Sequence, residues 1–474
     1  MNPSVPSSVD VLVVGAGIYG AAATYEASRR GLSVLLIDRG DFGAGTSQNS
    51  LKIAHGGLRY LKDLDPARSR ESIEERRRLL QIAPHLVHPL RCRMHTAGMS
   101  WFARVLLRGG LLANDWLTRG CNRDVPPPNH LPRSSYPCWF DARIEDTERL
   151  LLGFIDAAEH LGKGRCWARN YTRMEEYVHD GNRVVGARLS GLSKVTAGTV
   201  IDCTGVSRSG QPAAFSMNLV VGPLPLVDSG EAVAMKHPKD ERHVFAVPWR
   251  ASTLIGTYDR EYPHDPSEPL RFDAAWIDEF LDWLQPVHPD LARLTRADIR
   301  LVHFGLLPLD RPGDRHPGRR FIVHEEENGV IRVIGVKYTT ARGVSSLAVQ
   351  RAAVRLGRDP MPDASHIPLP RLRDHRQLVR AYIGSHARLG TRLSRRLPDV
   401  PFGAVAYAVE REQARTLTDV LFRRLGLAQA GHPGPERVGA VATALQELLG
   451  WSNAERYDQI EAFNQDPHFV PART

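Results

Sequence analysis

The sequence predicts an α/β protein in which a Rossmann-like nucleotide-binding domain is interleaved with an antiparallel-sheet domain and followed by a small C-terminal helical domain. Three observations support this fold class. A glycine-rich turn between two apolar runs opens the chain, short β-type runs fill residues 216–310, and helical periodicity dominates the final hundred or so positions. The 474 residues exceed one typical domain, so two or three units are expected.

The first predicted element is a short apolar strand, Val11–Val14, followed at once by a Gly-x-Gly-x-x-Gly turn and an alanine-rich helix. Gly15 permits the tight turn, Gly17 lets a pyrophosphate approach the backbone, and Gly20 lets the helix pack on the strand. A second apolar run ends at Asp38, 18 residues after Gly20, near the offset of a carboxylate that binds a ribose hydroxyl. The pattern predicts a dinucleotide site and disfavours NADP, but it does not separate NAD from FAD.

The middle of the chain predicts a second sheet. Residues 216–310 contain several short β-type runs and one helix near residues 274–284, which is typical of an antiparallel sheet. The apolar run at residues 330–335 predicts a last buried strand that returns to the nucleotide-binding domain.

After a proline-rich linker near residues 360–370, the sequence predicts a helical unit. Residues 404–425 and 435–449 show apolar side chains at i, i+3 and i+4 spacing. Ser452-Asn-Ala-Glu455 is typical of a capping box that opens a final short helix. We expect this unit to serve packing or oligomerisation, including a homodimer.

Composition limits the function classes. The net charge of +9 suggests nucleic acid, but the basic residues are mixed with acids along helices, as in residues 71–78, so a nucleic-acid partner is not expected. The five cysteines have neither metal-ligand nor disulfide spacing, which predicts reduced thiols in a cytoplasmic protein without a metal site. No apolar run reaches the roughly 18 residues of a membrane-spanning helix, and no secretory signal is visible.

Five ordered blocks of the chain carry a family resemblance. They are residues 46–60 with the run His55-Gly56-Gly57-Leu-Arg59-Tyr60, residues 216–220 with Pro248-Trp249, residues 254–259, residues 335–342 and residues 406–420. Together they resemble FAD-dependent glycerol-3-phosphate dehydrogenases, which belong to the D-amino-acid-oxidase-like flavoproteins. The resemblance implies noncovalent FAD, hydride transfer from an alcohol carbon to flavin N5, and quinone or oxygen as electron acceptor. It implies oxidation of a small hydroxylated, anionic substrate such as glycerol 3-phosphate to the ketone, dihydroxyacetone phosphate.

The resemblance also implies domain boundaries. Residues 1–360 are expected to form the FAD-dependent oxidoreductase region, and residues 371–474 the C-terminal helical domain. The expected FAD-binding parts are residues 8–90, 141–215 and 311–360, and the expected substrate-domain parts are residues 91–140 and 216–310.

Candidate site residues follow from the same blocks. Lys337 is expected to contact substrate or flavin, Arg59 to bind the substrate anion, and Tyr60 to hydrogen-bond the same substrate. His55 is a candidate base, although its glycine neighbours can also serve only to bring backbone close to the ring. Arg320 is expected to supply another substrate contact. The cofactor-binding candidates are Gly15, Gly17, Gly20, Asp38, Thr46, Ser47, Lys52, His55, Gly56, Gly57, Gly205, Gly335, Lys337 and Thr339.

The helix that follows Lys337 is expected to begin near Thr339 or Thr340, so that its amide-rich N-terminus favours negative charge on the cofactor. The substrate pocket departs from the family pattern. Leu307 stands where the family has an arginine that grips the substrate phosphate, and Val336 replaces a glycine. Losing such a bidentate contact weakens phosphate recognition. An alternative is therefore an FAD oxidoreductase of the same superfamily acting on a different polyol, hydroxy acid or amine.

Two segments raise the question of a peripheral membrane contact. The tryptophan-bearing run near residues 101–117 has near-helical apolar spacing, which favours a helix packed on the substrate domain over one at a membrane interface. Residues 371–396 carry eight arginines and one acid, a pattern that suits anionic lipid headgroups on the inner face of the cytoplasmic membrane.

Overall fold

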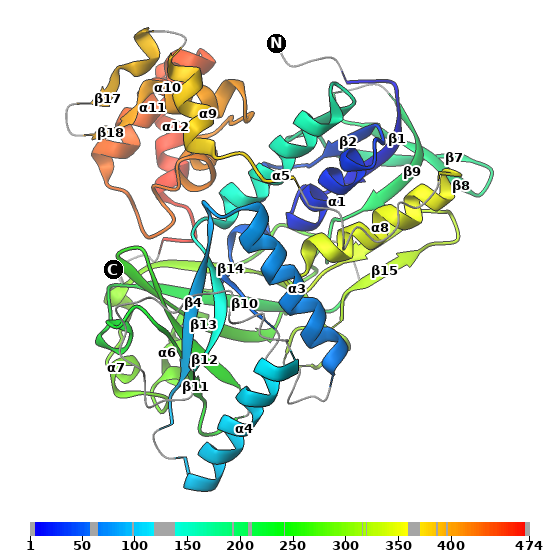
Figure 1. The fold of residues 1–474 in the computed structure, drawn as a ribbon. Coiled ribbons are helices and arrows are strands. Elements are labelled where there is room, and N and C mark those ends of the chain that lie inside the picture. Colours follow the sequence, from blue (N-terminus) through cyan, green and yellow to red (C-terminus); the bar gives the residue numbers. More distant parts are fainter. Residues whose placement is uncertain are drawn as a thin grey trace.

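The computed structural model describes residues 5–56, 65–96, 99–117, 138–191, 194–206, 211–240, 242–314, 316–318, 320–358, 370–384, 387–394 and 397–469. Figure 1 shows two sheet-based halves and a helical unit that contacts both of them. The predicted fold class is confirmed.

The first sheet carries the glycine turn. Its strands run in the order β15-β16-β9-β1-β2-β6, with the hairpin β7–β8 joined to β9. β1 lies between β2 and β9 and is parallel to both. The strands are β1 (Ser8–Val14), β2 (Val34–Ile37), β6 (Cys166–Arg169), β7 (Met174–Asp180), β8 (Arg183–Leu189), β9 (Val195–Asp202), β15 (Ile322–Glu325) and β16 (Ile331–Ile334). Parallel strands covered on both faces explain the continuous apolar runs that the sequence shows.

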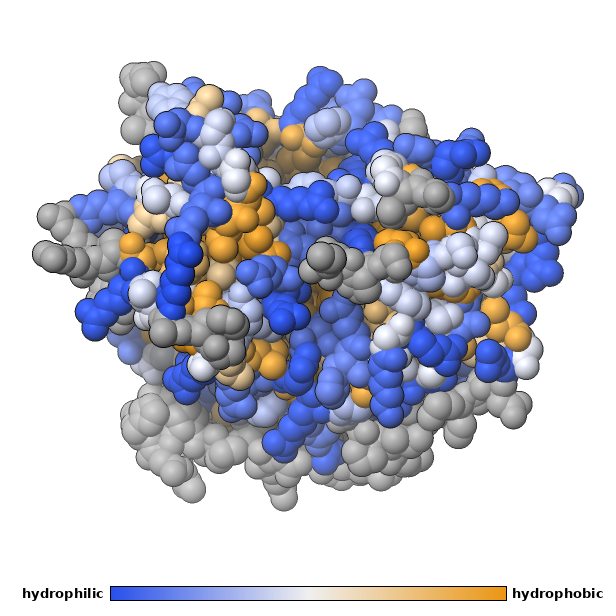
Figure 2. Space-filling view, turned by 90° about the horizontal axis from the view of Figure 1, so that it is seen from above, coloured by the Kyte–Doolittle hydropathy of each residue, from blue (hydrophilic) through white to orange (hydrophobic). Residues whose placement is uncertain are grey.

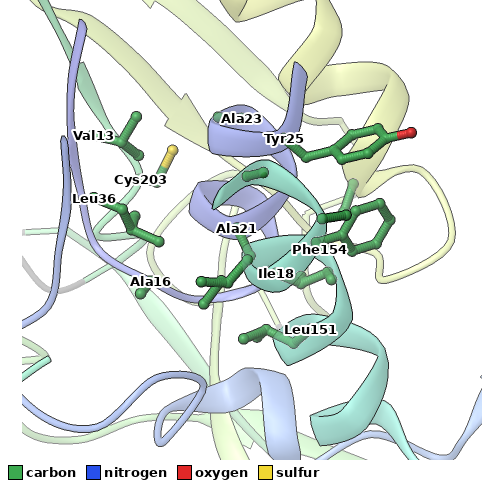
Figure 3. Close-up of a cluster of buried hydrophobic side chains, with 14 of the residues drawn as sticks. Val13, Ala16, Ile18, Ala21, Ala23, Tyr25, Leu36, Leu151, Phe154 and Cys203 are labelled. Atoms are coloured by element: carbon green, nitrogen blue, oxygen red, sulfur yellow. The ribbon is translucent and has the colours of Figure 1, made fainter. Parts of the chain in front are cut away.

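Three helices pack beside this sheet: α1 (Ile18–Arg29), α5 (Thr147–Gly162) and α8 (Ala341–Arg355). α1 lies between the other two (Figure 1). Its small side chains, Ala21 and Ala23 among them, let the helix lie close to Val13 and Leu36 of the strands (Figure 3). The Tyr25 ring meets the Phe154 ring of α5 edge to face, with centroids 5.4 Å apart.

The second sheet is mostly antiparallel, as predicted, with the order β14-β10-β13-β12-β11-β4-β5-β3. Its strands are β3 (Ile53–Ala54), β4 (Val87–Met94), β5 (Cys138–Ile144), β10 (Ala213–Val221), β11 (Ala232–Lys236), β12 (His243–Trp249), β13 (Ser252–Glu261) and β14 (Ile299–Pro308). β3, β4 and β5 come from the first third of the chain, so the two sheets are interleaved in sequence.

Side chains of β10 alternate between two environments. Phe215, Met217 and Leu219 join a core with Phe280 of α6 (Ala275–Leu284), a helix that the sequence placed at residues 274–284. Because successive side chains of a strand point to opposite faces, Ser216 and Asn218 face the other way, toward the first sheet. The short helix α7 (Pro289–Ala292) follows α6.

The helix predicted near residues 101–117 is α4 (Trp101–Leu117), but it does not pack as expected. Leu111 is buried, whereas Trp101, Phe102, Leu106 and their neighbours are exposed; Trp101 is 76% exposed. Five of the nine large hydrophobic side chains recorded as exposed in the described residues belong to α4: Trp101, Phe102, Val105, Leu106 and Leu112. The expected packing on the substrate domain is therefore limited to Leu107 and Leu111, which join a cluster with Trp139 of the second sheet. α3 (Pro66–Ile82) contacts β4 and β5 of the second sheet.

The helical unit near the end of the chain contains α9 (His375–Gly384), α10 (Phe402–Glu410), a π-helix (Asp419–Arg424), α11 (Pro435–Leu449) and α12 (Asn453–Asn464). The capping box at Ser452 and Glu455 is confirmed. Two expectations are corrected. A small hairpin, β17 (Arg392–Ser394) and β18 (Leu397–Pro401), interrupts the helices, and the run 404–425 is split after Glu410.

The helical unit shares a core with the second sheet, because Val405, Leu417 and Val441 lie in one cluster with Trp249 and Leu254. Figure 2 views the face that carries this unit and the first sheet, where hydrophobic areas lie scattered among predominantly hydrophilic side chains. No helix in the described residues is long and apolar enough to cross a membrane.

Candidate active site

A cavity of about 1080 Å³ lies between the two sheets. The first sheet contributes the glycine turn, Asp38 and the ends of β9 and β16, while the second contributes β10, β13 and β14. Residues 466–468, after α12, complete one part of its wall. A volume at the upper end of ordinary ligand pockets suits an extended ligand such as a dinucleotide.

The glycine turn forms one end of the cavity. Gly15 has φ +94°, and a Cβ there would lie 2.8 Å from the carbonyl oxygen of Cys203, the residue that follows β9. Gly17 precedes α1 and lines the cavity, which places the N-terminus of this helix where it favours an anionic group. Gly20 does not line the cavity; a Cβ there would meet the Gly15 oxygen at 1.8 Å, which is the helix–strand packing role predicted for it.

Asp38 lies at the end of β2 and lines the cavity, as predicted. Its carboxylate accepts hydrogen bonds from Ala16 N at 2.6 Å and Gly40 N at 2.9 Å, which holds the glycine turn against β2. Burial raises the pKa of Asp38 above its ordinary value despite those two hydrogen bonds. Gly205, after β9, also lines the cavity.

Thr46 and Ser47 join the two sheets at the cavity. Ser47 Oγ accepts a hydrogen bond from Ile18 N at 3.0 Å, and Thr46 Oγ1 donates to the Leu306 carbonyl oxygen at 2.8 Å. This close contact between Thr46 and β14 requires glycine at position 305, because a Cβ there would lie 2.8 Å from Thr46 Oγ1. Both predicted residues therefore lie in the cavity wall.

Lys52 does not lie where it was expected. Its side chain is fully buried, and Nζ donates to Thr147 Oγ1 at 2.5 Å and to Glu148 at 3.0 Å. Burial raises the pKa of Glu148 to about 7 although the Lys52 charge opposes that rise. Lys52 is not among the cavity-lining residues, so its expected role as a cofactor contact is wrong. An ammonium that loses its water needs a carboxylate partner, and α5 supplies one.

The strand end predicted to face the cofactor does line the cavity, from Gly335 to Thr339. A Cβ on Gly335 would lie 1.7 Å from the Tyr19 ring, so only glycine fits there. The Tyr19 hydroxyl donates to the Lys337 carbonyl oxygen at 2.7 Å and accepts from Lys337 N at 3.2 Å, which fixes this backbone. Thr340 occupies the N-cap position of α8 without a side-chain capping bond.

His55 follows β3 and lines the cavity, with its side chain 40% exposed. Its Nδ1 lies 3.0 Å from Oδ2 of Asp141, a residue of β5 that the sequence prediction missed. Gly56 was expected in the cavity wall but does not line it. Its N–H instead donates to Asp141 Oδ1 at 2.6 Å. The only sequence signal for this pairing was a carboxylate inside a β-type run, which is uncommon unless it has a buried partner.

Leu307 lines the cavity as a half-buried side chain at the end of β14. Arg320 is exposed and does not line the cavity, so its expected substrate contact is wrong; the loop after β14 carries it outward. His303 is buried beside Asn49, outside the cavity wall, and burial lowers its pKa well below the ordinary value. Gly57, Arg59 and Tyr60 lie outside the described residues.

Comparisons with known proteins agree with this geometry. Residues 10–351 match the family of FAD dependent oxidoreductases, and residues 374–456 match the C-terminal domain of alpha-glycerophosphate oxidase. A glycerol-3-phosphate dehydrogenase of Synechocystis sp. is 27% identical over 97% of this chain and 96% of its own length. Glycerol-3-phosphate dehydrogenase 2 of Mycobacterium tuberculosis is 28% identical, with 94% and 86% covered.

The fold matches solved structures as well. The glycerol-3-phosphate dehydrogenase of Bacillus halodurans, solved with FAD, has a TM-score of 0.70 at 22% identity and covers 98% of this chain and 95% of its own. The residues of the cavity fit FAD, since Gly15 and Gly17, the N-terminus of α1 and the Asp38 carboxylate all line it, as in dinucleotide-binding folds. FAD is the cofactor, and the chain belongs to the family of FAD dependent oxidoreductases.

Proposed function

We propose that the protein oxidises a small hydroxylated, anionic substrate, such as glycerol 3-phosphate, to the corresponding ketone. The observation that carries this proposal is that His55 and Lys337 line the same cavity as the nucleotide-binding glycine turn. Bound FAD supplies the hydride acceptor. The relatives named above as glycerol-3-phosphate dehydrogenases support the choice of substrate.

Each residue has a proposed role. His55 accepts the proton of the substrate hydroxyl, because its ring reaches the cavity while Asp141 holds the opposite nitrogen. Lys337 and the first turn of α8 place positive charge beside the reacting groups. Arg59 and Tyr60 remain proposed substrate contacts on the strength of the sequence alone.

The direct test is anaerobic addition of glycerol 3-phosphate to purified holoprotein while the flavin absorbance is recorded. Bleaching of the flavin band supports the proposal. An unchanged spectrum at high substrate concentration would remove this substrate, and the same assay with polyols, hydroxy acids and amines would then identify the donor class.

Leu307 favours the second candidate function, oxidation of a different polyol, hydroxy acid or amine. We expect Leu307→Arg to lower KM for glycerol 3-phosphate roughly tenfold, because a charge-assisted contact contributes about 1.5–3 kcal/mol. Leu307→Met, which keeps the volume and adds no charge, is the matched control. Steady-state kinetics check the effect; an unchanged KM in the arginine variant would mean that the anion is bound elsewhere.

The remaining proposals concern location and partners. The exposed side chains of α4 and the arginines Arg104 and Arg108 between them suit a peripheral contact with an anionic membrane surface on the cytoplasmic side. Such a contact would bring the enzyme close to quinone as electron acceptor, with oxygen as the alternative. The proposed domains are the oxidoreductase region, residues 1–360, and the helical domain, residues 371–474, which offers a surface for a homodimer.

Replacing Trp101 and Phe102 of α4 with serine is expected to weaken co-sedimentation with anionic vesicles at least about tenfold, because each buried aromatic side chain contributes roughly 1.5–3 kcal/mol. Tyr457→Ser on α12 removes an equally exposed aromatic ring (66%) and serves as the matched control. Equal vesicle binding by the α4 variant and the parent protein would reject the membrane proposal.

A further inference from the structure

The Asp141 carboxylate lies at the centre of a buried group of hydrogen-bond donors. Its Oδ2 lies 3.0 Å from His55 Nδ1, and the carboxylate accepts from Gly56 N at 2.6 Å and from Trp139 Nε1 at 3.1 Å. Asp141 itself is only 2% exposed. The donors Gly56 N and Trp139 Nε1 leave the carboxylate little freedom to turn away from the His55 ring.

The strand register creates this arrangement. β3 is antiparallel to β5, with Ile53 opposite Arg143 and Ala54 opposite Ala142. One more step along both strands brings His55 beside Asp141, residues that are 86 positions apart in the chain. The His55 ring also meets the Phe245 ring of β12 edge to face, with centroids 5.1 Å apart, so its orientation is limited on a second side.

The charges around Asp141 keep it ionised. Burial by itself would raise its pKa, but the hydrogen bonds from His55 and Gly56 and the charge of Arg76, 3.6 Å away on α3, hold the pKa below its ordinary value. The nearby Cys92 thiol of β4 has its pKa raised well above the ordinary value by burial, so it stays neutral. An ionised carboxylate only accepts hydrogen bonds, so the proton between the two side chains belongs to His55 Nδ1.

The neighbouring glycine serves the same arrangement. A Cβ on Gly56 would lie 2.4 Å from Arg76 Nη1, so a larger residue would displace the guanidinium from Asp141. Gly56 therefore leaves room for Arg76, whose positive charge compensates the buried carboxylate of Asp141. This role differs from the close approach to the cofactor that the sequence suggested.

We propose that Asp141 is a positioning residue that holds His55 in the Nδ1-protonated tautomer, so that Nε2 is the atom that takes the substrate proton. The inference rests on the proposed role of His55 in alcohol oxidation. In that step the O–H bond of the substrate breaks and its proton goes to Nε2, while the C–H bond of the hydroxyl-bearing carbon breaks and its hydride would go to bound FAD, which leaves a C=O bond. Asp141 stabilises the imidazolium that forms.

The test replaces Asp141 with asparagine in the holoprotein. Asparagine keeps the shape of the side chain but can donate to Nδ1, which favours the wrong tautomer. We expect the rate of flavin reduction to fall roughly 10²- to 10⁴-fold with flavin content unchanged.

A matched control separates positioning from stability. Asp146 is also a buried carboxylate that accepts from a backbone amide, Arg149 N at 2.9 Å, but it caps α5 and does not contact His55. Asp146→Asn should lower thermal stability and leave the rate of flavin reduction close to that of the parent protein. If Asp141→Asn reduces its flavin at the parent rate, the positioning role is overturned.

A second measurement does not depend on turnover. Nitrogen-15 spectra of imidazole-labelled protein report the tautomer of each histidine, and the signals absent from a His55→Gln variant belong to His55. The parent protein should show Nδ1 protonated and Asp141→Asn should show a mixture with Nε2 protonated. The same tautomer in both proteins overturns the inference, whereas failure of every hydroxylated substrate to bleach the parent flavin overturns the proposed function instead.

Discussion

Replacing Asp41 with alanine is expected to lower the free energy of unfolding by about 3–5 kcal/mol, the effect of breaking a buried ion pair by removing one partner. Asp41 Oδ2 accepts from Arg423 Nε and from Arg424 Nη1, both at 2.5 Å, and Oδ1 accepts from Asn170 Nδ2 at 2.9 Å. All three charged side chains are at most 5% exposed. The variant leaves two guanidinium groups buried without this carboxylate. Urea denaturation at neutral pH measures the loss.

The same variant is expected to bind FAD less tightly. Arg423 Nη1 also donates to Gln48 Oε1 at 3.0 Å, so the network connects the C-terminal helical unit to the segment that carries Thr46 and Ser47. Glu176→Ala, which breaks an exposed pair with Arg188, is the control and should leave the melting temperature almost unchanged. Equal melting temperatures for the parent protein and the Asp41 variant would contradict the prediction.

The stability that Asp41 contributes should also depend on pH with a known sign. The two arginines, acting against desolvation, hold the pKa of Asp41 well below its ordinary value. A depressed pKa in the folded state gives stability that is present above the ordinary pKa of about 4 and is lost as the pH falls toward the folded value. The difference in unfolding free energy between parent and Asp41→Asn should therefore shrink below about pH 4.

Replacing His55 with glutamine is expected to slow flavin reduction by roughly 10²- to 10⁴-fold, the usual contribution of a positioned general base. Glutamine fills a similar volume and still offers a donor toward Asp141, but it cannot accept a proton at neutral pH. Anaerobic stopped-flow spectroscopy measures the rate of flavin bleaching, and the flavin absorbance of the purified variant shows whether FAD remains bound.

His303→Gln is the matched control for this variant. His303 is a buried histidine beside Asn49 that does not line the cavity, so its replacement should affect stability more than the rate of bleaching. A His55→Gln protein that reduces its flavin at the parent rate would exclude His55 as the base.

The prediction of the nucleotide-binding half succeeded because its signals are local. A strand, a glycine turn and a helix lie within about 20 residues, and Gly20 is required by a neighbour in sequence, because a Cβ there would meet the Gly15 oxygen. The helix at residues 275–284 and the capping box at Ser452 were equally readable, because periodicity and capping depend on neighbours in sequence.

The site itself needed longer-range information. Lys52 was expected to contact the cofactor because it lies in the block of residues 46–60. Its side chain instead pairs with Glu148, which is 96 positions away in the chain, and lies outside the cavity wall. Asp141 could not be linked to His55 without the register of β3 on β5. The apolar spacing of α4 predicted a buried hydrophobic face. The folded structure shows that most of its large hydrophobic side chains are exposed instead.

The sequence by itself therefore determined the fold class, the family resemblance and the nucleotide cradle, since those depend on short-range sterics and hydrophobic patterning. Only the tertiary structure decided which charged groups meet. A charged group buried in a low-dielectric core needs a partner, and strand pairing and helix packing determine which residue becomes that partner.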